Sequence, residues 1–252
     1  MKTMNTTTEG IATTQPRTSV AARRRTPAST RVNWWVPTAL IALTAIPSLT
    51  GVLALVGFAK GMQITPDDSR FAAMPLPVVI HILSALPFCI LGAFQFAPGF
   101  RRRWPGWHRL AGRVVVPCGL VAGLEGLWMT QFYPELQTSL LYSFRMVFGS
   151  AMVLSIALGF MAILRRDIAR HRAWMMRGYA IGQGAGTQAL TGLLWVLIFG
   201  AQGQPGKELL MGASWFINLL VAEWIIRKMS FRRLFKSKHL FARNTYQRKF
   251  SH

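Results

Sequence analysis

FRMVFGSAMVLSIALGFMAIL, residues 144–164, is an apolar run that leads directly into the basic stretch RRDIARHR, residues 165–172. A membrane-spanning helix needs about 20 mostly apolar residues to cross the hydrocarbon core of a bilayer. The run has this length and carries one charged residue, Arg145, near its start. The sequence therefore predicts a membrane helix over 144–164 that ends at a cationic turn.

Five further runs have similar length and composition, and they cover residues 34–58, 77–96, 111–129, 174–199 and 209–226. Of the 252 residues, 52% are hydrophobic and 15% are charged, whereas a soluble domain carries about 25% charged residues. We therefore predict an all-α polytopic membrane protein with six transmembrane helices over 34–226. A basic N-terminal tail over 1–33, expected to be disordered, and a basic amphipathic C-terminal tail over 227–252 complete the organisation.

The positive charges alternate between the two ends of these runs. Of the 29 Lys and Arg residues, 25 lie in the first 33 residues, in 97–113, in 165–177 or after residue 226. Basic residues concentrate on the cytoplasmic side of membrane proteins. The pattern predicts that both termini are cytoplasmic, which agrees with an even number of helices.

The net charge of +21 raises the question of a nucleic-acid partner. The basic residues flank apolar segments and do not line one soluble face, so we expect no such partner. Cys89 and Cys118 both lie inside apolar runs, and their spacing predicts neither a disulfide framework nor a metal site. No catalytic motif is present, and GQGAG at 182–186 lies inside a predicted helix without the strand and lysine of a phosphate-binding loop.

The stretch RRDIARHR has a counterpart in RRWPGWHR, residues 102–109, which lies 63 positions earlier. Both stretches fall on predicted cytoplasmic loops, one between the second and third helices and one between the fourth and fifth. Two related helical hairpins would explain the repetition, as in transporters built from parallel repeats. Chance similarity between two basic loops is the alternative.

These loops and the adjacent helix starts form a predicted basic belt at the cytoplasmic face. Such a belt can bind the anionic head groups of the inner leaflet or a protein partner. Its arginines are Arg102, Arg103, Arg109, Arg113, Arg165, Arg166, Arg172 and Arg177.

The segments GAFQF, RRRWPGWHRLAGR and HRAWMMRGYA, together with His81, resemble the bacterial membrane family labelled domain of unknown function 2306. The resemblance covers about residues 75–200, or the second to fifth predicted helices. It implies a multi-pass protein of the bacterial inner membrane and assigns no activity.

Three ionisable residues fall near the predicted outer face, namely His81, Glu125 and Arg145. A charge inside the hydrocarbon costs about 2.5–3.5 kcal/mol, so each calls for a partner or a purpose. One interpretation is a structural salt bridge between Glu125 and Arg145 with His81 beside it. The other is a site for transport of protons or small solutes.

At the predicted inner face, His108 and His171 lie at one depth on two different helices. Such a pair could ligate a haem b, which would make the protein a membrane redox carrier. Interfacial anchoring explains the same histidines equally well. Glu223 on the sixth run lacks a basic neighbour on its own helix within the membrane, and we expect Arg113 or Arg177 to be its ion-pair partner.

The fifth run is the most polar of the six, because it contains Gln183, Thr187, Gln188 and Thr191. Gly178, Gly182 and Gly186 recur there every four residues, and Gly119 and Gly123 form a shorter series on the third run. Such series let the backbone of a neighbouring helix approach closely, so they predict packing seams.

Overall fold

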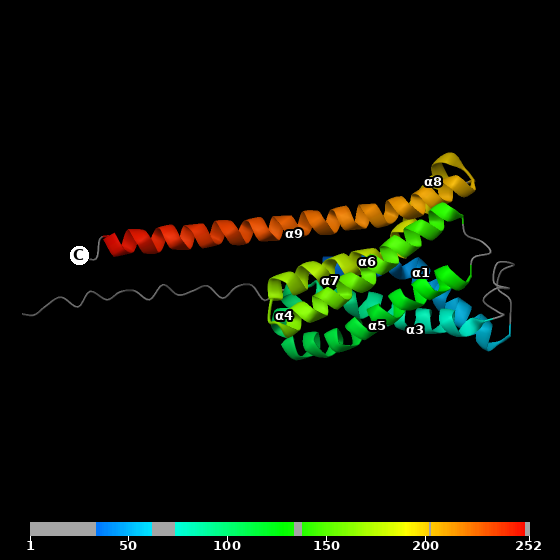
Figure 1. Cartoon of the computed structure of the whole chain (residues 1–252), viewed down its shortest axis with the longest axis horizontal. Coiled ribbons are helices and arrows are strands. Elements are labelled where there is room, and N and C mark those ends of the chain that lie inside the picture. Colours follow the sequence, from blue (N-terminus) through cyan, green and yellow to red (C-terminus); the bar gives the residue numbers. More distant parts are fainter. Residues whose placement is uncertain (1–33, 62–73, 134–137, 202, 250–252) are drawn as a thin grey trace, which may run out of the picture. The chain divides into compact units, whose positions relative to one another are not determined.

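The computed structural model describes residues 34–61, 74–133, 138–201 and 203–249, with the backbone alone over 233–249. The N-terminal tail over 1–33 lies outside these ranges. All regular elements in the described ranges are helices (Figure 1). They are α1 (Trp35–Ala59), α3 (Pro75–Gln95), α4 (Pro98–Arg103), α5 (Pro105–Phe132), α6 (Ser139–Leu164), α7 (Ile168–Gly182), α8 (Gly184–Phe199) and α9 (Gln204–Lys249).

Five of the described helices are long and apolar enough to cross a membrane: α1, α3, α5, α6 and the Gln204–Arg232 part of α9. Helix α8 is apolar but shorter. Many of their large apolar side chains are exposed, including Leu197, Phe199 and Leu220, as expected for surfaces that face lipid. The prediction of an all-helical, multi-pass membrane protein is thus confirmed, while the count of six crossings and the cytoplasmic termini stay predictions.

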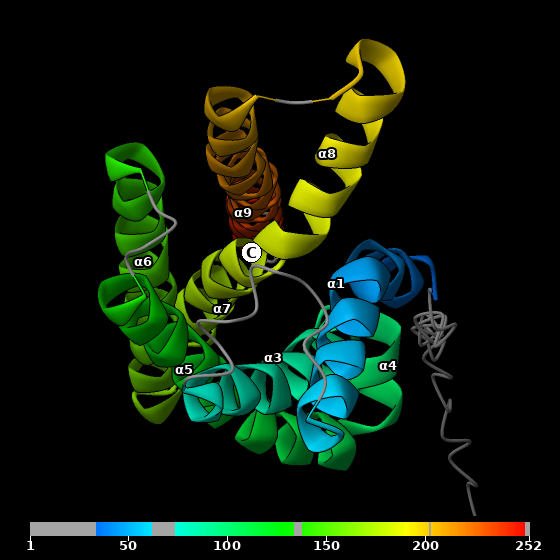
Figure 2. The same cartoon turned by 90° about the vertical axis from the view of Figure 1, so that its right-hand side faces the viewer.

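The helices pack as two antiparallel hairpins, α3 against α5 and α6 against α7, with α5 also against α6 (Figure 2). Helix α1 packs on α3 and α8, and α9 packs on α7 and α8. The core between the hairpins is apolar and includes Phe88, Phe148, Met152 and Ile156. Whether the hairpins derive from a duplication stays a prediction.

Both RRxxxxHR stretches lie at the same end of the helix bundle, which we call the basic end. The loop between α6 and α7 and the short helix α4 both lie at this end (Figure 1). His171 is near enough to His108 to act on it electrostatically. The antiparallel course of the hairpins accounts for this, because α5 and α7 both start where their partner helices end.

The glycine series mark packing seams, as predicted. A Cβ atom at Gly178 would overlap Ile156 of α6, and one at Gly182 would overlap Phe88 of α3. At Gly119, a Cβ atom would overlap the same two side chains. Small residues therefore let four helices converge on one apolar core.

Gly186 makes the closest approach, because a Cβ atom there would overlap the backbone carbonyl of Leu43 on α1. Backbone cannot move aside as a flexible side chain can. Gly186→Ala is therefore expected to destabilise the protein by about 2 kcal/mol, the usual cost of overpacking. Chemical denaturation in mixed micelles measures this, with Gly206→Ala, whose Cβ would meet nothing, as the control.

The prediction of a single fifth helix over 174–199 is wrong, because two helices, α7 and α8, meet at Gln183. Three features explain the break. Gly182, Gly184 and Gly186 are weak helix formers. The carbonyl of Ala180 accepts a hydrogen bond from Asn218 Nδ2 at 3.0 Å. The N–H groups of Gly186 and Thr187 both donate hydrogen bonds to the Gln183 carbonyl.

The turn between α6 and α7 holds Arg166 in the left-handed region, at φ 59°. The Asp167 N–H donates a hydrogen bond to the Ala162 carbonyl, and this bond defines a Schellman motif. Glycine is the residue that this position favours. Arg166→Gly is therefore expected to raise the free energy of unfolding by about 1 kcal/mol, and Arg165→Gly, at φ −80°, is expected to lower it.

The predicted boundary at residue 227 is not a helix end, because α9 continues unbroken to Lys249. The first helix starts one residue after the predicted position, whereas α3, α5, α6 and α9 start about two to six residues before the predicted positions. In particular, α6 starts at Ser139 and not at residue 144. Arg145 therefore lies almost two turns inside this helix, deeper than its position in the predicted run indicated.

Candidate functional site

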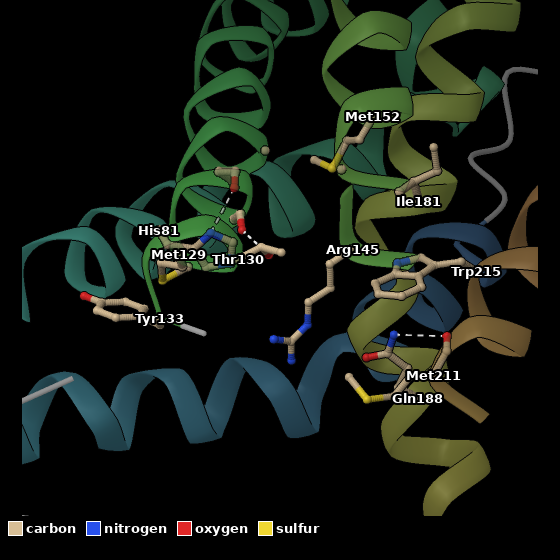
Figure 3. A pocket seen from close by; sticks show the side chains of 14 residues that line it. His81, Met129, Thr130, Tyr133, Arg145, Met152, Ile181, Gln188, Met211 and Trp215 are labelled. Carbon is tan, nitrogen blue, oxygen red and sulfur yellow. Dashed lines mark hydrogen bonds between the residues drawn. The ribbon is translucent and has the colours of Figure 1, made fainter. Parts of the chain in front are cut away.

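A cavity of about 300 Å³ lies between α3, α5, α6, α7, α8 and α9, and Figure 3 shows it from close by. It lies toward the end of the bundle opposite the basic end, because His81 is in the second turn of α3, whose other end leads to the basic end. We call it the His81 cavity. Two of the three ionisable residues predicted near the outer face, His81 and Arg145, line it. The other lining residues are Ala122, Gly123, Gly126, Met129, Thr130, Tyr133, Gly149, Met152, Ile181, Gln188, Met211 and Trp215.

His81 is anchored to the backbone of α5. Its Nδ1 lies 2.9 Å from the carbonyl oxygen of Ala122, and the ring packs against Gly126, where a Cβ atom would approach the ring to within 3.7 Å. A carbonyl oxygen only accepts, so Nδ1 must carry a proton and donate it. The second nitrogen, Nε2, is consequently the one that gains or loses a proton.

Arg145 supplies the positive charge of the cavity. In Figure 3 its side chain projects into the space between His81 and Thr130 on one side and Gln188 and Met211 on the other. Guanidinium groups bind carboxylates with two parallel hydrogen bonds. The cavity therefore offers a cation on one wall and a titratable imidazole on the facing wall.

Glu125 is not among the residues that line the cavity, and it forms no ion pair with Arg145. The interpretation of the outer cluster as a Glu125–Arg145 salt bridge is therefore wrong. The reason is geometric: residue spacing places both at a similar depth, but it does not fix the direction in which each side chain leaves its helix.

Neutral polar groups and soft apolar side chains complete the wall. Thr130 donates to the Gly126 carbonyl at 2.7 Å, and Gln188 Nε2 donates to the Met211 carbonyl at 3.3 Å. Three methionines and Trp215 form the apolar part. Thr130 and Trp215 had no distinguishing signal in the sequence, and the one sign of Gln188 was the unusual polarity of the fifth run.

The apolar part and the charged part together resemble an ordinary small-molecule site, with apolar walls and a few polar groups that fix orientation. A ligand that fits has a small apolar body and one anionic group. Phosphates and carboxylates both satisfy the guanidinium. Since Arg145 is the single arginine among the described residues that line the cavity, and much of the lining is apolar, its chemistry favours a monocarboxylate.

Nearer the basic end, Glu223 of α9 pairs with Arg177 of α7. Arg177 Nε donates to Oε1 at 2.5 Å, and a terminal guanidinium nitrogen donates to Oε2 at 3.2 Å. The guanidinium also lies 4.6 Å from the ring centroid of Trp174. Of the two partners expected for Glu223, the structure thus selects Arg177, while Arg113 is exposed on α5.

His108 and His171 differ in their surroundings. His171 Nδ1 donates to the Gly159 carbonyl of α6 at 2.9 Å, which leaves Nε2 available as an acceptor. The Nδ1 of His108 is buried and has no hydrogen-bond partner among the described residues. Haem ligation by this pair stays a prediction, for which a visible spectrum of the purified protein is the direct measurement.

The predicted basic belt has two parts. Six of its arginines are exposed, whereas the two on α7 are half-buried, Arg177 against Glu223 and Arg172 with a terminal nitrogen 3.1 Å from the sulfur of Met229. Arg103 also lies over the ring of Trp104, at 5.0 Å from its centroid. The exposed members are Arg102, Arg103, Arg109, Arg113, Arg165 and Arg166.

No curated protein and no solved structure matches this chain. The model of one family, described as predicted membrane protein (DUF2306), matches residues 78–226. The match includes most of α3, all of α4 to α8, and α9 as far as residue 226. It therefore includes every residue that lines the His81 cavity and the Arg177–Glu223 pair. The chain belongs to the DUF2306 family of predicted membrane proteins.

Proposed function

We propose that this membrane protein binds a small monocarboxylate in the His81 cavity as the first step of proton-coupled transport. The observation that carries the proposal is that Arg145 and His81 line one cavity of about 300 Å³. The guanidinium would hold the carboxylate, and the methionines and Trp215 would hold the apolar body. The Nε2 atom of His81 would donate to the ligand when protonated and accept from it when neutral.

The direction of access follows from the charge pattern. With the basic end at the cytoplasmic face of an inner membrane, the His81 cavity lies toward the outer face. Helices α7 and α8 would together form one discontinuous crossing, which brings the number of crossings to six. Discontinuous helices are common at the substrate sites of secondary transporters.

Calorimetry on the purified protein tests the proposal with hexanoate and with its neutral analogue hexanamide. Hexanoate is expected to bind about 100-fold more tightly, since a charge-assisted pair with Arg145 contributes about 2.8 kcal/mol. Hexyl phosphate serves as a second anionic probe. The proposal would be contradicted if hexanoate and hexanamide bound with equal affinity, or if neither hexanoate nor hexyl phosphate bound.

A second candidate function concerns the exposed part of the basic belt. We propose that it binds anionic head groups of the inner leaflet, because six exposed arginines at one end of the bundle attract a negatively charged surface. In nanodiscs, phosphatidylglycerol is expected to raise the melting temperature relative to phosphatidylcholine. The double variant Arg102→Gln with Arg103→Gln should reduce this increase in melting temperature. An unchanged increase would contradict head-group binding by the exposed arginines.

A further inference from the structure

The groups that line the His81 cavity change in character along its length. Helix α6 begins at Ser139, at the end of the bundle opposite the basic end. Counted from there, Arg145 lies about 9 Å deep and Met152 about 20 Å deep, at about 1.5 Å per residue. Tyr133, just after the end of α5, lines the shallow end of the cavity, and Ile181, next to the break between α7 and α8, lines the deep end. The long axis of the cavity therefore runs roughly along the helices.

The deep end of the cavity is apolar and rests on the core. Met152 and Ile181 are 7% and 4% exposed, and both belong to the buried cluster that also contains Phe88 and Phe148. Trp215 forms the adjoining wall, and its ring is stacked on Phe148 at a centroid distance of 5.1 Å. A bound water molecule needs two to four polar partners, which the side chains of Met152 and Ile181 do not supply. This end of the cavity therefore suits an alkyl group better than water.

The charged and titratable groups of the cavity lie at a shallower level. His81 is in the second turn of α3 and Arg145 is in the second turn of α6, and both helices begin at the end opposite the basic end. Helical side chains lean toward the N-terminus of their own helix. In agreement, Figure 3 shows the Arg145 side chain extending away from Met152 and Ile181. An anionic group at Arg145 would thus lie near the mouth, with the apolar end of the cavity beneath it.

We propose that the His81 cavity takes an unbranched medium-chain carboxylate tail first, and that Met152 and Ile181 set the longest chain that it accepts. The inference rests on the proposed function, because Arg145 has to hold the carboxylate. The polar head then stays at the level of His81 and Arg145, and the methyl end contacts the floor of the cavity.

The spacing of two side chains on α6 gives the length limit. Arg145 and Met152 lean in the same direction, so their separation of seven positions corresponds to about 10 Å of depth. An extended alkyl chain advances about 1.3 Å per carbon atom. Chains of up to about eight carbon atoms therefore fit, whereas longer chains would have to displace the packed side chains of the floor.

Calorimetry in nanodiscs tests the limit with butanoate, hexanoate, octanoate, decanoate and dodecanoate. The affinity is expected to rise about fourfold per methylene group as far as octanoate, because each group is removed from water, and to fall for decanoate. Arg145→Met, which lacks the partner of the carboxylate, measures how much of each acid partitions into the lipid.

Two variants enlarge the floor. Ile181→Ala removes three carbon atoms from it, so decanoate is expected to bind to this variant at least as tightly as octanoate does. Met152→Ala should have the same effect. Ile217→Ala on the exposed face of α9 is the matched control and should leave the limit at octanoate. Hexanoate binding on the same samples shows that each variant is folded with its anion site intact.

A ligand with a polar tail tests the orientation. In 8-hydroxyoctanoate the hydroxyl group would be buried between Met152 and Ile181, and burial without a hydrogen bond is costly. We therefore expect it to bind at least about tenfold more weakly than octanoate. If the tail pointed out of the cavity instead, the hydroxyl group would stay in water and the two affinities would be similar.

The outcomes separate this inference from the proposed function. The inference would be overturned, and the proposed function kept, if the affinity of the native protein rose through dodecanoate or if 8-hydroxyoctanoate bound as tightly as octanoate. It would also be overturned if floor variants that still bind hexanoate kept the native limit. If none of the acids bound to the native protein, the proposed function would be contradicted, and the length limit with it.

Discussion

Glu223→Ala is expected to lower the free energy of unfolding by about 3 kcal/mol. The substitution leaves the Arg177 guanidinium inside the membrane domain without its carboxylate, and an uncompensated charge at that depth costs about 2.5–3.5 kcal/mol. Two hydrogen bonds to Glu223 oxygens are lost at the same time. Trp174 remains stacked on the guanidinium and retains a small part of the interaction. Unfolding by denaturing detergent in mixed micelles measures the change.

The double variant Arg177→Met with Glu223→Met separates the cost of an orphaned charge from the value of the pair. Replacing both partners of an ion pair by apolar residues is often nearly neutral, because the desolvation cost of both charges disappears together. We expect the double variant to be more stable than Glu223→Ala. If the double variant lost as much stability as the sum of the losses of Arg177→Met and Glu223→Met measured singly, Arg177 and Glu223 would not act as a pair.

The helices α1, α3, α5 and α6 could be predicted from sequence because the signal for a membrane helix is local. Each needs only enough consecutive apolar residues to cross the hydrocarbon. The break at Gln183 could not be predicted in this way. It depends on Asn218, which lies on another helix, and on the close approach of Gly186 to the α1 backbone at Leu43.

The site could be predicted in part for a related reason. Arg145 and His81 were conspicuous because ionisable side chains are rare in membrane helices. Glu125 was equally conspicuous, yet it lies off the cavity, since sequence spacing gives depth along a helix and leaves the facing direction of neighbouring helices open. Thr130 and Gln188 carried no comparable signal, because neutral polar residues also serve as ordinary contacts between helices.

Arg145→Met is expected to weaken hexanoate binding at least about 100-fold, which corresponds to a loss of about 2.8 kcal/mol. The methionine keeps most of the side-chain volume and removes the group that would pair with the carboxylate, so the affinity for hexanamide should change little. Calorimetry with both ligands measures the difference. The apolar wall formed by Met129, Met152 and Trp215 remains in place in the variant.

Two further variants sharpen this test. Arg145→Lys retains the charge but loses the planar fork, so an intermediate, roughly tenfold weakening is expected. Arg103→Met removes an exposed arginine at the basic end, far from the cavity lining, and should leave hexanoate affinity unchanged. If Arg103→Met weakened binding as much as Arg145→Met, the anion would be responding to the net charge of the protein. Selective loss in Arg145→Met alone would instead assign the carboxylate to the His81 cavity, because Arg145 is the one arginine among the described residues that line it.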